Sequence, residues 1–241
     1  MSMSETNVVI FGYNFPHKKT QDLVFSLLGQ GFKISALIAA DAVKLNISES
    51  TVRTKIKHIG LLNPAEYAGH LGIEFVNLPH NSRRCEQYLR ELKPALGIIG
   101  GARIIKQPII ERFSVGIVNV HPALLPEVRG LDSMLWSIMH DIPLGVTAHL
   151  IDARIDLGQG LIRKLLPVYQ DDTIFDLSER IYDSQIDIAA ASLFKALNGD
   201  TWSIENEIYY GKMTPEYEQQ ALARLNEYKA HQHREKEMYV G

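Results

Sequence analysis

The chain has 241 residues, of which 46% are hydrophobic and 22% are charged, and its net charge is −3. These totals are typical of a globular protein with a full hydrophobic core, built as one large domain or as one domain with a small appendage. The absence of a basic excess argues against a DNA or tRNA partner, and the single cysteine excludes an intrachain disulfide.

The first residues lack the charged start and the long apolar core of a secretory signal peptide, and no apolar run is long enough to span a membrane. We therefore expect a cytoplasmic protein. The nine histidines show none of the spacings that are typical of zinc sites, so we expect no metal.

Short apolar runs alternate with segments of helical spacing along the first 170 residues or so. We expect the polar segment 43–59 to be a partly helical surface excursion, and the helix at 21–31 to follow an N-cap at Thr20. The alternation predicts an α/β fold, with an open, mostly parallel, Rossmann-like sheet and helices on both faces. The other predicted helices cover 64–70, 83–92, 106–113 and 131–140. The predicted strands cover 8–11, 34–40, 73–76, 95–99, 116–120, 145–151 and 161–169, the last being the final core strand.

The C-terminal part begins with a long helix and then changes character. Thr173 and Asp176 form a capping-box-like start, and an Asn-Gly pair ends this helix at 198–199. A hairpin or extended arm should follow, and then a charged helix that starts at Pro215 and fades near Tyr228. We therefore divide the chain into a catalytic domain, 1–200, and a C-terminal hairpin and helix appendage, 201–241. Such an appendage is more typical of an interface or a lid than of a second domain, which makes a homodimer plausible.

Asn119 and His121 stand two residues apart at the end of an apolar run, just before a proline-bounded loop. The period of a strand puts both side chains on the same side, and Asp156 from a second strand-end loop could join them. These groups suit acyl transfer to an amine, because they offer a donor for an oxyanion, a titratable ring and a carboxylate to orient it. The alternative is that Asn119 and His121 hydrogen-bond a turn and that Asp156 caps one. Spacing alone does not separate the two interpretations.

Longer segments around these residues resemble a known family. "VNVHPALLPEVRG" and "GVTAHLIDARIDLGQG" are similar to the formyltransferases that use N10-formyltetrahydrofolate, which carry Asn-x-His-Pro-Ser/Ala-Leu-Leu-Pro and a later Asp-x-Gly. The upstream segment "GGARIIKQPIIERF" looks like the folate-contacting segment of that family. The resemblance runs continuously from about residue 95 to about residue 166 and is looser on both sides.

The resemblance implies that Asn119, His121 and Asp156 are the catalytic residues. Asn119 would donate to the oxyanion, and His121 would be a second donor or the base that takes the amine proton. Asp156 would orient His121, hold a relay water, or both, and the two should titrate as a pair.

The resemblance also implies N10-formyltetrahydrofolate as co-substrate, and it implies a set of folate-binding positions. Asp152 has the alternative of being a turn or surface carboxylate, and His149 is as consistent with a structural histidine as with a functional one. The implied cofactor-binding residues are Arg103, Ile104 and Ile105, which would supply backbone groups and apolar walls for the pterin, together with Leu125, Asp152 and Gly158.

The amine that receives the formyl group is inferred by comparing relatives. Glycinamide ribonucleotide formyltransferases carry a Gly-Ser-Asn phosphate loop, whereas this chain has "GYNFPHKKT" after its first strand. Methionyl-tRNA formyltransferases add a C-terminal RNA-binding barrel, and formyltetrahydrofolate hydrolases usually add an N-terminal regulatory domain. The resemblance therefore favours a nucleotide-linked amino sugar of a polysaccharide pathway. Transfer to another amine, folate hydrolysis, and a non-catalytic nucleotide-binding module remain the alternatives.

Three basic residues are the candidates for binding this acceptor. Lys18 and Lys19 lie near a helix start, where they could meet a pyrophosphate, although a pair of lysines on a loop is more often solvated. Arg129 would either contact the substrate or fix the loop that carries it. The expected partners are thus an amino sugar nucleotide and a folate, with no nucleic acid and no membrane.

Overall fold

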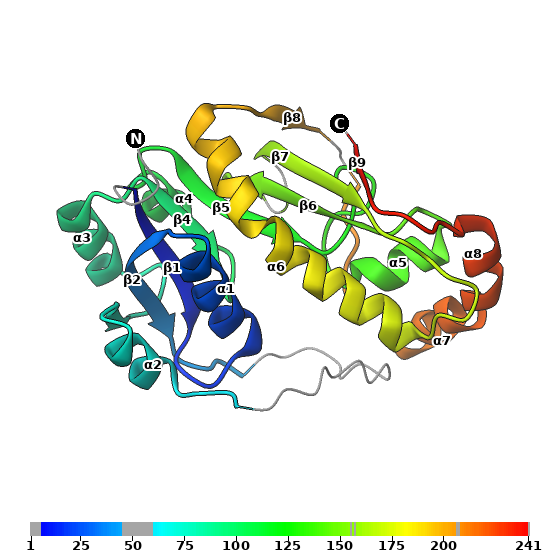
Figure 1. Ribbon diagram of the computed structural model, residues 1–241, viewed down its shortest axis with the longest axis horizontal. Helices are drawn as coiled ribbons and strands as arrows, with labels where there is room; N and C mark the ends of the chain where they lie inside the picture. The colour runs from blue at the N-terminus through cyan, green and yellow to red at the C-terminus, as the bar shows by residue number, and fades with distance from the viewer. Residues whose placement is uncertain (1–5, 45–59, 155, 157, 206–207, 241) are drawn as a thin grey trace.

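The computed structural model describes residues 6–44, 60–154, 156, 158–205 and 208–240. Within them one nine-stranded sheet has the order β3-β2-β1-β4-β5-β6-β7-β8, and β9 also pairs with β7 (Figure 1). The strands are β1 (Asn7–Tyr13), β2 (Lys33–Ala40), β3 (Glu74–Asn77), β4 (Leu96–Ile99), β5 (Gly116–His121), β6 (Gly145–Leu150), β7 (Gly158–Leu165), β8 (Trp202–Ile204) and β9 (Met238–Val240).

The sheet is parallel from β3 to β5 and antiparallel from β5 onward, so β7 runs in the same direction as the first five strands. The expected open, Rossmann-like α/β sheet is therefore confirmed. The helices are α1 (Lys18–Gly29), α2 (Pro64–His70), α3 (Arg83–Leu92), α4 (Gln107–Ile110), α5 (Ser133–Met139), α6 (Ile174–Asn198), α7 (Pro215–Ala223) and α8 (Leu225–Gln232).

The two faces of the sheet are buried by different helices. On one face, apolar side chains of α1 and α6 pack against alternate strand residues such as Val8, Ile10 and Val118. On the other face, α3 and α4 pack against the intervening residues, among them Val9 and Ile117. This alternation follows from the two-residue period of a strand, and it fixes which residues of β5 can meet the site.

Several predicted boundaries were wrong. The helix α1 begins at Lys18 rather than after Thr20, because the His17 ring caps it by accepting from the Thr20 amide at 3.3 Å. Strand β7 ends at Leu165 rather than at Tyr169, because Pro167 lacks the N–H that a longer ladder needs. It is not the last strand of the sheet, since β8 and β9 follow it in the chain. The charged C-terminal helix is two helices, α7 and α8, with Arg224 between them. The helices expected at 106–113 and 131–140 are shorter, as α4 and α5, and most of the excursion expected at 43–59 lies outside the described residues.

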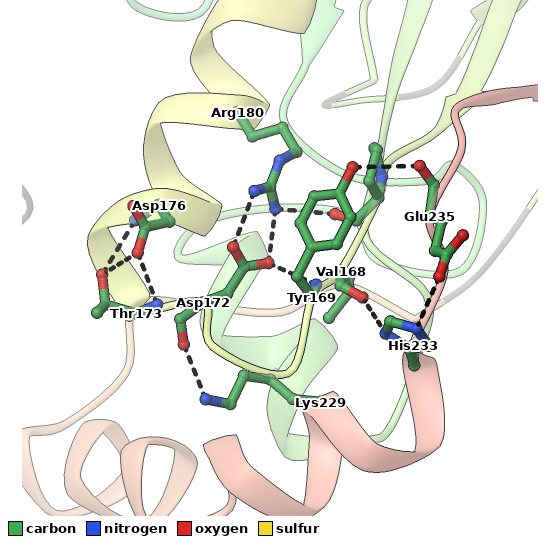
Figure 2. A network of polar contacts seen from close by, with 10 residues as sticks. Val168, Tyr169, Asp172, Thr173, Asp176, Arg180, Lys229, His233 and Glu235 are labelled. Carbon is green, nitrogen blue, oxygen red and sulfur yellow. Dashed lines mark hydrogen bonds and ion pairs between the residues drawn. The ribbon is translucent and has the colours of Figure 1, made fainter.

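The capping box of α6 is present, with Thr173 and Asp176 bonded reciprocally, and Gly199 ends the helix in the left-handed region. Asp172, just before the N-cap of α6, also binds the C-terminal segment (Figure 2). Arg180 forms a bidentate pair with Asp172 at 2.7 and 2.8 Å, and Lys229 of α8 donates to the Asp172 carbonyl at 2.8 Å. These contacts hold the C-terminal helices beside the sheet.

The segment after residue 200 joins the same sheet through β8 and β9, both of which pair with β7. The absence of a side chain at Gly160 lets β8 approach, since a Cβ there would lie 2.1 Å from the Trp202 ring. The division of the chain near residue 200 stays a prediction. No helix in the described part of the chain is both long and apolar enough to cross a membrane.

Candidate active site

The site is built on the end of β5. Asn119 and His121 project from the same face as Ile117, because they alternate with the buried Val118 and Val120 of the opposite face. Helix α4 covers Ile117 but is only four residues long, so loops rather than a helix cover the end of the strand. The two side chains that were predicted to lie together therefore face a surface that loops enclose.

Asp156 reaches this face from the loop between β6 and β7. Its Oδ1 lies 3.5 Å from His121 Nδ1, and its Oδ2 accepts from the Gly130 amide at 3.1 Å. The residue has φ 51°, a left-handed conformation that Asp tolerates better than most residues. Gly158 follows at φ 108°, where a Cβ would lie 2.2 Å from the Leu150 carbonyl. The lack of a side chain at Gly158 thus lets β7 begin close to the end of β6.

The His121 ring is held at both nitrogens. Nε2 lies 3.0 Å from the Val128 carbonyl, and because a carbonyl can only accept, Nε2 carries the hydrogen. Nδ1 is then the nitrogen that gains or loses a proton, and it faces Asp156. Burial would raise the pKa of the Asp156 carboxyl, but the hydrogen bond and charge of His121 and the hydrogen bond from the Gly130 amide hold that pKa below its usual range. The carboxylate therefore stays ionised beside the ring.

Asn119 is oriented by a residue of the neighbouring strand. Asn119 pairs with His149 across β5 and β6, and its Nδ2 lies 3.3 Å from His149 Nε2. An amide nitrogen only donates, so one Asn119 hydrogen is held by His149 and the second is left to point elsewhere. His149 is fully buried, which makes it a positioning residue for the amide.

A small cavity of about 160 Å³ opens beside Asn119 and Asp156. The cavity is lined by Asn119, Asp156 and four of the six predicted folate-binding residues, Arg103, Ile104, Ile105 and Asp152. His121 does not line it and is linked to it through Asp156. The remaining lining residues are Ile99, Ala102, Ile151, Ala153 and Arg154.

The other two predicted folate residues, Leu125 and Gly158, do not line this cavity. Leu125 is fully buried, packs against Ile204, and has its amide bonded to the Thr147 hydroxyl at 2.9 Å. Both residues shape the loops that surround the site.

The three predicted acceptor-binding residues have different surroundings. Lys18 is paired with Asp22 and lies over the Tyr182 ring at 4.5 Å, so its charge is already compensated. Lys19 is half-buried, its Nζ lies 3.4 Å from the carbonyl of Val120, and burial lowers its pKa to about 8. The guanidinium of Arg129 lies over the Tyr209 ring at 5.5 Å, in the loop that carries Gly130.

Two residues that hold the site were not identified from the sequence. His149 was left open between two roles, and Gly130 was noted only as part of a motif. The strand pattern around His149 was visible, but its pairing with Asn119 depends on the register of β5 and β6. Among the described residues no group of three His, Cys, Asp or Glu side chains could hold a metal ion.

The chain is similar in sequence to known formyltransferases. Residues 53–192 match a family model described as formyl transferase. The methionyl-tRNA formyltransferase of Koribacter versatilis is 30% identical over 129 residues, which cover 52% of this chain and 41% of that protein. The GDP-perosamine N-formyltransferase of Brucella melitensis is 27% identical over 177 residues, which cover 73% of this chain and 62% of that protein. The match thus spans less than two thirds of the length of these relatives.

Solved structures share the fold. The phosphoribosylglycinamide formyltransferase of Anaplasma phagocytophilum superposes with a TM-score of 0.62 at 19% identity, covering 87% of this chain and 100% of that one. The formyltransferase PseJ of Anoxybacillus kamchatkensis, in complex with UDP-4,6-dideoxy-4-formamido-L-AltNAc and tetrahydrofolate, superposes with a TM-score of 0.53 at 19% identity, covering 85% of each chain. Since the family model covers more than half of its length, the chain belongs to the formyl transferase family.

Proposed function

We propose that this protein transfers the formyl group of N10-formyltetrahydrofolate to the amine of a nucleotide-linked amino sugar. The observation that carries the proposal is that Asn119 and Asp156 line one cavity and that His121 is paired with Asp156. Membership of the formyl transferase family supports the reaction. The relative named for GDP-perosamine, and the solved formyltransferase bound to a UDP-linked formamido sugar and tetrahydrofolate, support the acceptor and the donor.

The cavity beside Asn119 fits one ring system of a folate. Its volume of about 160 Å³ is below the roughly 300–1,000 Å³ of sites that enclose drug-sized ligands. Ile105 and Ile151 offer apolar walls for a flat ring, and Asp152 offers a carboxylate at its edge. We propose that these residues, with the backbone of Arg103 and Ile104, hold the pterin. The bound folate supplies the formyl carbon that the acceptor amine attacks.

The chain's own residues then stabilise charge and move a proton. Asn119 directs its second amide hydrogen toward the formyl oxygen, where negative charge develops, and a donor of this kind contributes about 3–4 kcal/mol. The His121 and Asp156 pair receives the proton that the amine loses, at Nδ1 or Oδ1, because His121 Nε2 is already bonded to Val128. A positioned acid or base typically contributes about 10²–10⁴-fold.

A nucleotide-linked amino sugar suits the chain better than the other acceptors of the family. The loop after β1 has no Gly-Ser-Asn phosphate motif, and the net charge of −3 gives little attraction for tRNA. The Nζ of Lys19, in α1, lies 3.4 Å from the carbonyl of Val120, the residue that precedes His121. We propose that Lys19 and Arg129 bind the acceptor, and that Lys18, compensated by Asp22, has less effect.

A competition assay tests the proposal. Equal concentrations of nucleotide-linked 4-amino sugars, glycinamide ribonucleotide and methionyl-tRNA are incubated with N10-formyltetrahydrofolate, and the products are read by mass. Formylation of an amino sugar in preference to the other two is the expected result, and the His121→Ala variant serves as the inactive control. Preferential formylation of another acceptor would refute the substrate. Rapid release of formate without any acceptor would indicate a hydrolase.

The setting of the reaction is part of the same proposal. We place the enzyme in the cytoplasm, in a pathway that makes surface polysaccharide, with residues 201–241 as an appendage to the catalytic domain that could mediate a homodimer.

A further inference from the structure

A second and larger cavity, of about 580 Å³, lies at the carboxyl ends of four neighbouring parallel strands. In open α/β sheets, ligands bind in the crevice outside these strand ends. Tyr13 ends β1, Asp41 follows β2, His80 and Asn81 follow β3, and Arg103 and Ile104 follow β4. The site described above does not account for this cavity, although Arg103 and Ile104 line both.

One wall of the larger cavity is a pair of stacked aromatic rings. The rings of Tyr13 and Phe15 are 5.0 Å apart and nearly parallel, at 10°. Gly101 packs closely on the Tyr13 ring, since a Cβ on Gly101 would lie 2.8 Å from a ring carbon. Phe15, by contrast, is 36% exposed. His17 meets both rings edge-on and fixes the pair. The exposed Phe15 face is therefore a firm platform for a flat aromatic group such as a nucleobase.

Asp41 supplies a carboxylate at the rim of the same cavity. Its Oδ1 accepts from Asn14 Nδ2 at 2.8 Å and from Asn77 Nδ2 at 3.3 Å. Both amides donate to the same oxygen, and no donor within the described ranges bonds Oδ2. A carboxylate after the second strand is the group that accepts from the ribose 2′-hydroxyl in dinucleotide-binding sheets. Asp41 occupies that position and is held in place by two amides.

The wall shared by the two cavities links this position to the catalytic residues. Asn81 donates to the Ile104 carbonyl at 2.8 Å and accepts from the Lys106 amide at 2.8 Å, which fixes the segment. Arg103 thus stands between the aromatic platform and the cavity beside Asn119, where a guanidinium suits a pyrophosphate. The glutamate tail of a folate fits this larger cavity less well, because its carboxylates would be repelled by Asp41.

We propose that the larger cavity binds the nucleoside of the acceptor, with the base on Phe15 and the ribose 2′-hydroxyl donating to Asp41. This inference rests on the proposed function and narrows it to sugars linked to ribonucleotides rather than to 2′-deoxyribonucleotides.

Titration calorimetry with nucleoside diphosphates tests the inference without sugar or folate. The probes are ADP, GDP, CDP and UDP, each beside its 2′-deoxy counterpart. For at least one base, the ribonucleotide should bind about tenfold or more tightly than the deoxyribonucleotide, as expected for a hydrogen bond to a charged group. Equal binding of each pair, or no binding of any ribonucleotide, would overturn the inference.

Matched variants separate ribose recognition from stacking. Asp41→Ala and Asp41→Asn should bring the ribo to deoxy ratio within about twofold, because a charge-assisted hydrogen bond is lost. Phe15→Ala should weaken both members of a pair equally, and Asp200→Asn, at a carboxylate that is 72% exposed, should change neither. A ratio that survives in Asp41→Ala, or displacement of the nucleotide by tetrahydrofolate, would refute the assignment of the cavity. Formyl transfer to a deoxyribonucleotide-linked sugar as efficient as transfer to the ribonucleotide-linked sugar would refute this inference alone. Selective binding of ribonucleotides without any formyl transfer would refute only the proposed reaction.

Discussion

Replacement of Asp156 by Asn tests the catalytic assembly with little disturbance of the fold. The left-handed backbone at φ 51° strains an alanine, whereas Asn adopts it readily. The amide oxygen of Asn can still accept from the Gly130 amide, which now bonds Oδ2 at 3.1 Å. The change that matters is the loss of negative charge beside His121.

The distance in the structure sets the size of the expected effect. Two unit charges 3.5 Å apart, as between His121 Nδ1 and Asp156 Oδ1, interact with about 4.7 kcal/mol at an effective dielectric constant of roughly 20. At about 1.36 kcal/mol per factor of ten, this energy limits the loss to roughly 3,000-fold. Positioned acid and base groups typically contribute about 10²–10⁴-fold, so we expect turnover to fall about 100- to 1,000-fold.

Turnover is measured by mass spectrometry at saturating donor and acceptor, over a range of pH. The shape of the acid limb of the pH profile should change in Asp156→Asn, because the variant has no carboxylate beside His121. Asp200→Asn, at an exposed carboxylate, is the control. Turnover within tenfold of wild type, with an unchanged acid limb, would show that Asp156 does not act with His121.

Stability gives an independent readout of the same variant. The folded pKa of Asp156 is depressed below its ordinary value of about 3.8, so its carboxylate stabilises the fold above that pH, and this contribution is lost as the pH falls through the folded pKa. The variant should therefore melt below wild type at neutral pH, and the difference should shrink in acid. A difference that is the same at both pH values would contradict the depressed pKa.

Three further changes probe other parts of the site. Asn119→Ala should lower turnover about 100-fold or more through loss of the oxyanion donor, and His121→Ala should do so through loss of the acid and base group. Circular dichroism should show that both variants fold. Near-normal turnover in either variant would show that the replaced residue is not catalytic. Gly130→Ala should lower both the melting temperature and the turnover, because φ at Gly130 is 113° and a Cβ would lie 2.1 Å from the Tyr210 carbonyl. A residue in a strained conformation of this kind costs roughly 1–3 kcal/mol of stability. An unchanged melting temperature would contradict the close approach of the two backbones. Lys19→Met should remove a pH dependence of stability, because burial lowers the folded pKa of Lys19 from 10.5 to about 8. Between these values the unfolded chain binds more protons, so wild type should gain stability relative to the variant from pH 8 to pH 10 in chemical denaturation. Parallel stability profiles would show that burial does not lower the pKa of Lys19.

The sequence by itself determined the features that depend on neighbours along the chain. The strand carrying Asn119 and His121 was predicted within one residue of β5, because a two-residue period needs only adjacent positions. The capping box at Thr173 and the glycine at 199 also gave the limits of α6, since both signals act within one helical turn. The Asn-x-His and Asp-x-Gly motifs likewise indicated the family that the comparisons then established.

Only the tertiary structure decided how distant groups meet. His149 and Asn119 are 30 residues apart, and they touch because β6 runs antiparallel to β5 in one register, which long-range packing selects. Asp156 and Gly130 are 26 residues apart, and their contact depends on the path of two loops. Local patterns carry no information on that path, because loop conformation is set by what the ends are joined to. For the same reason the cavity bounded by Phe15, Asp41 and Arg103 could not be read from the sequence, since its walls follow three different strands and come together only when the sheet forms.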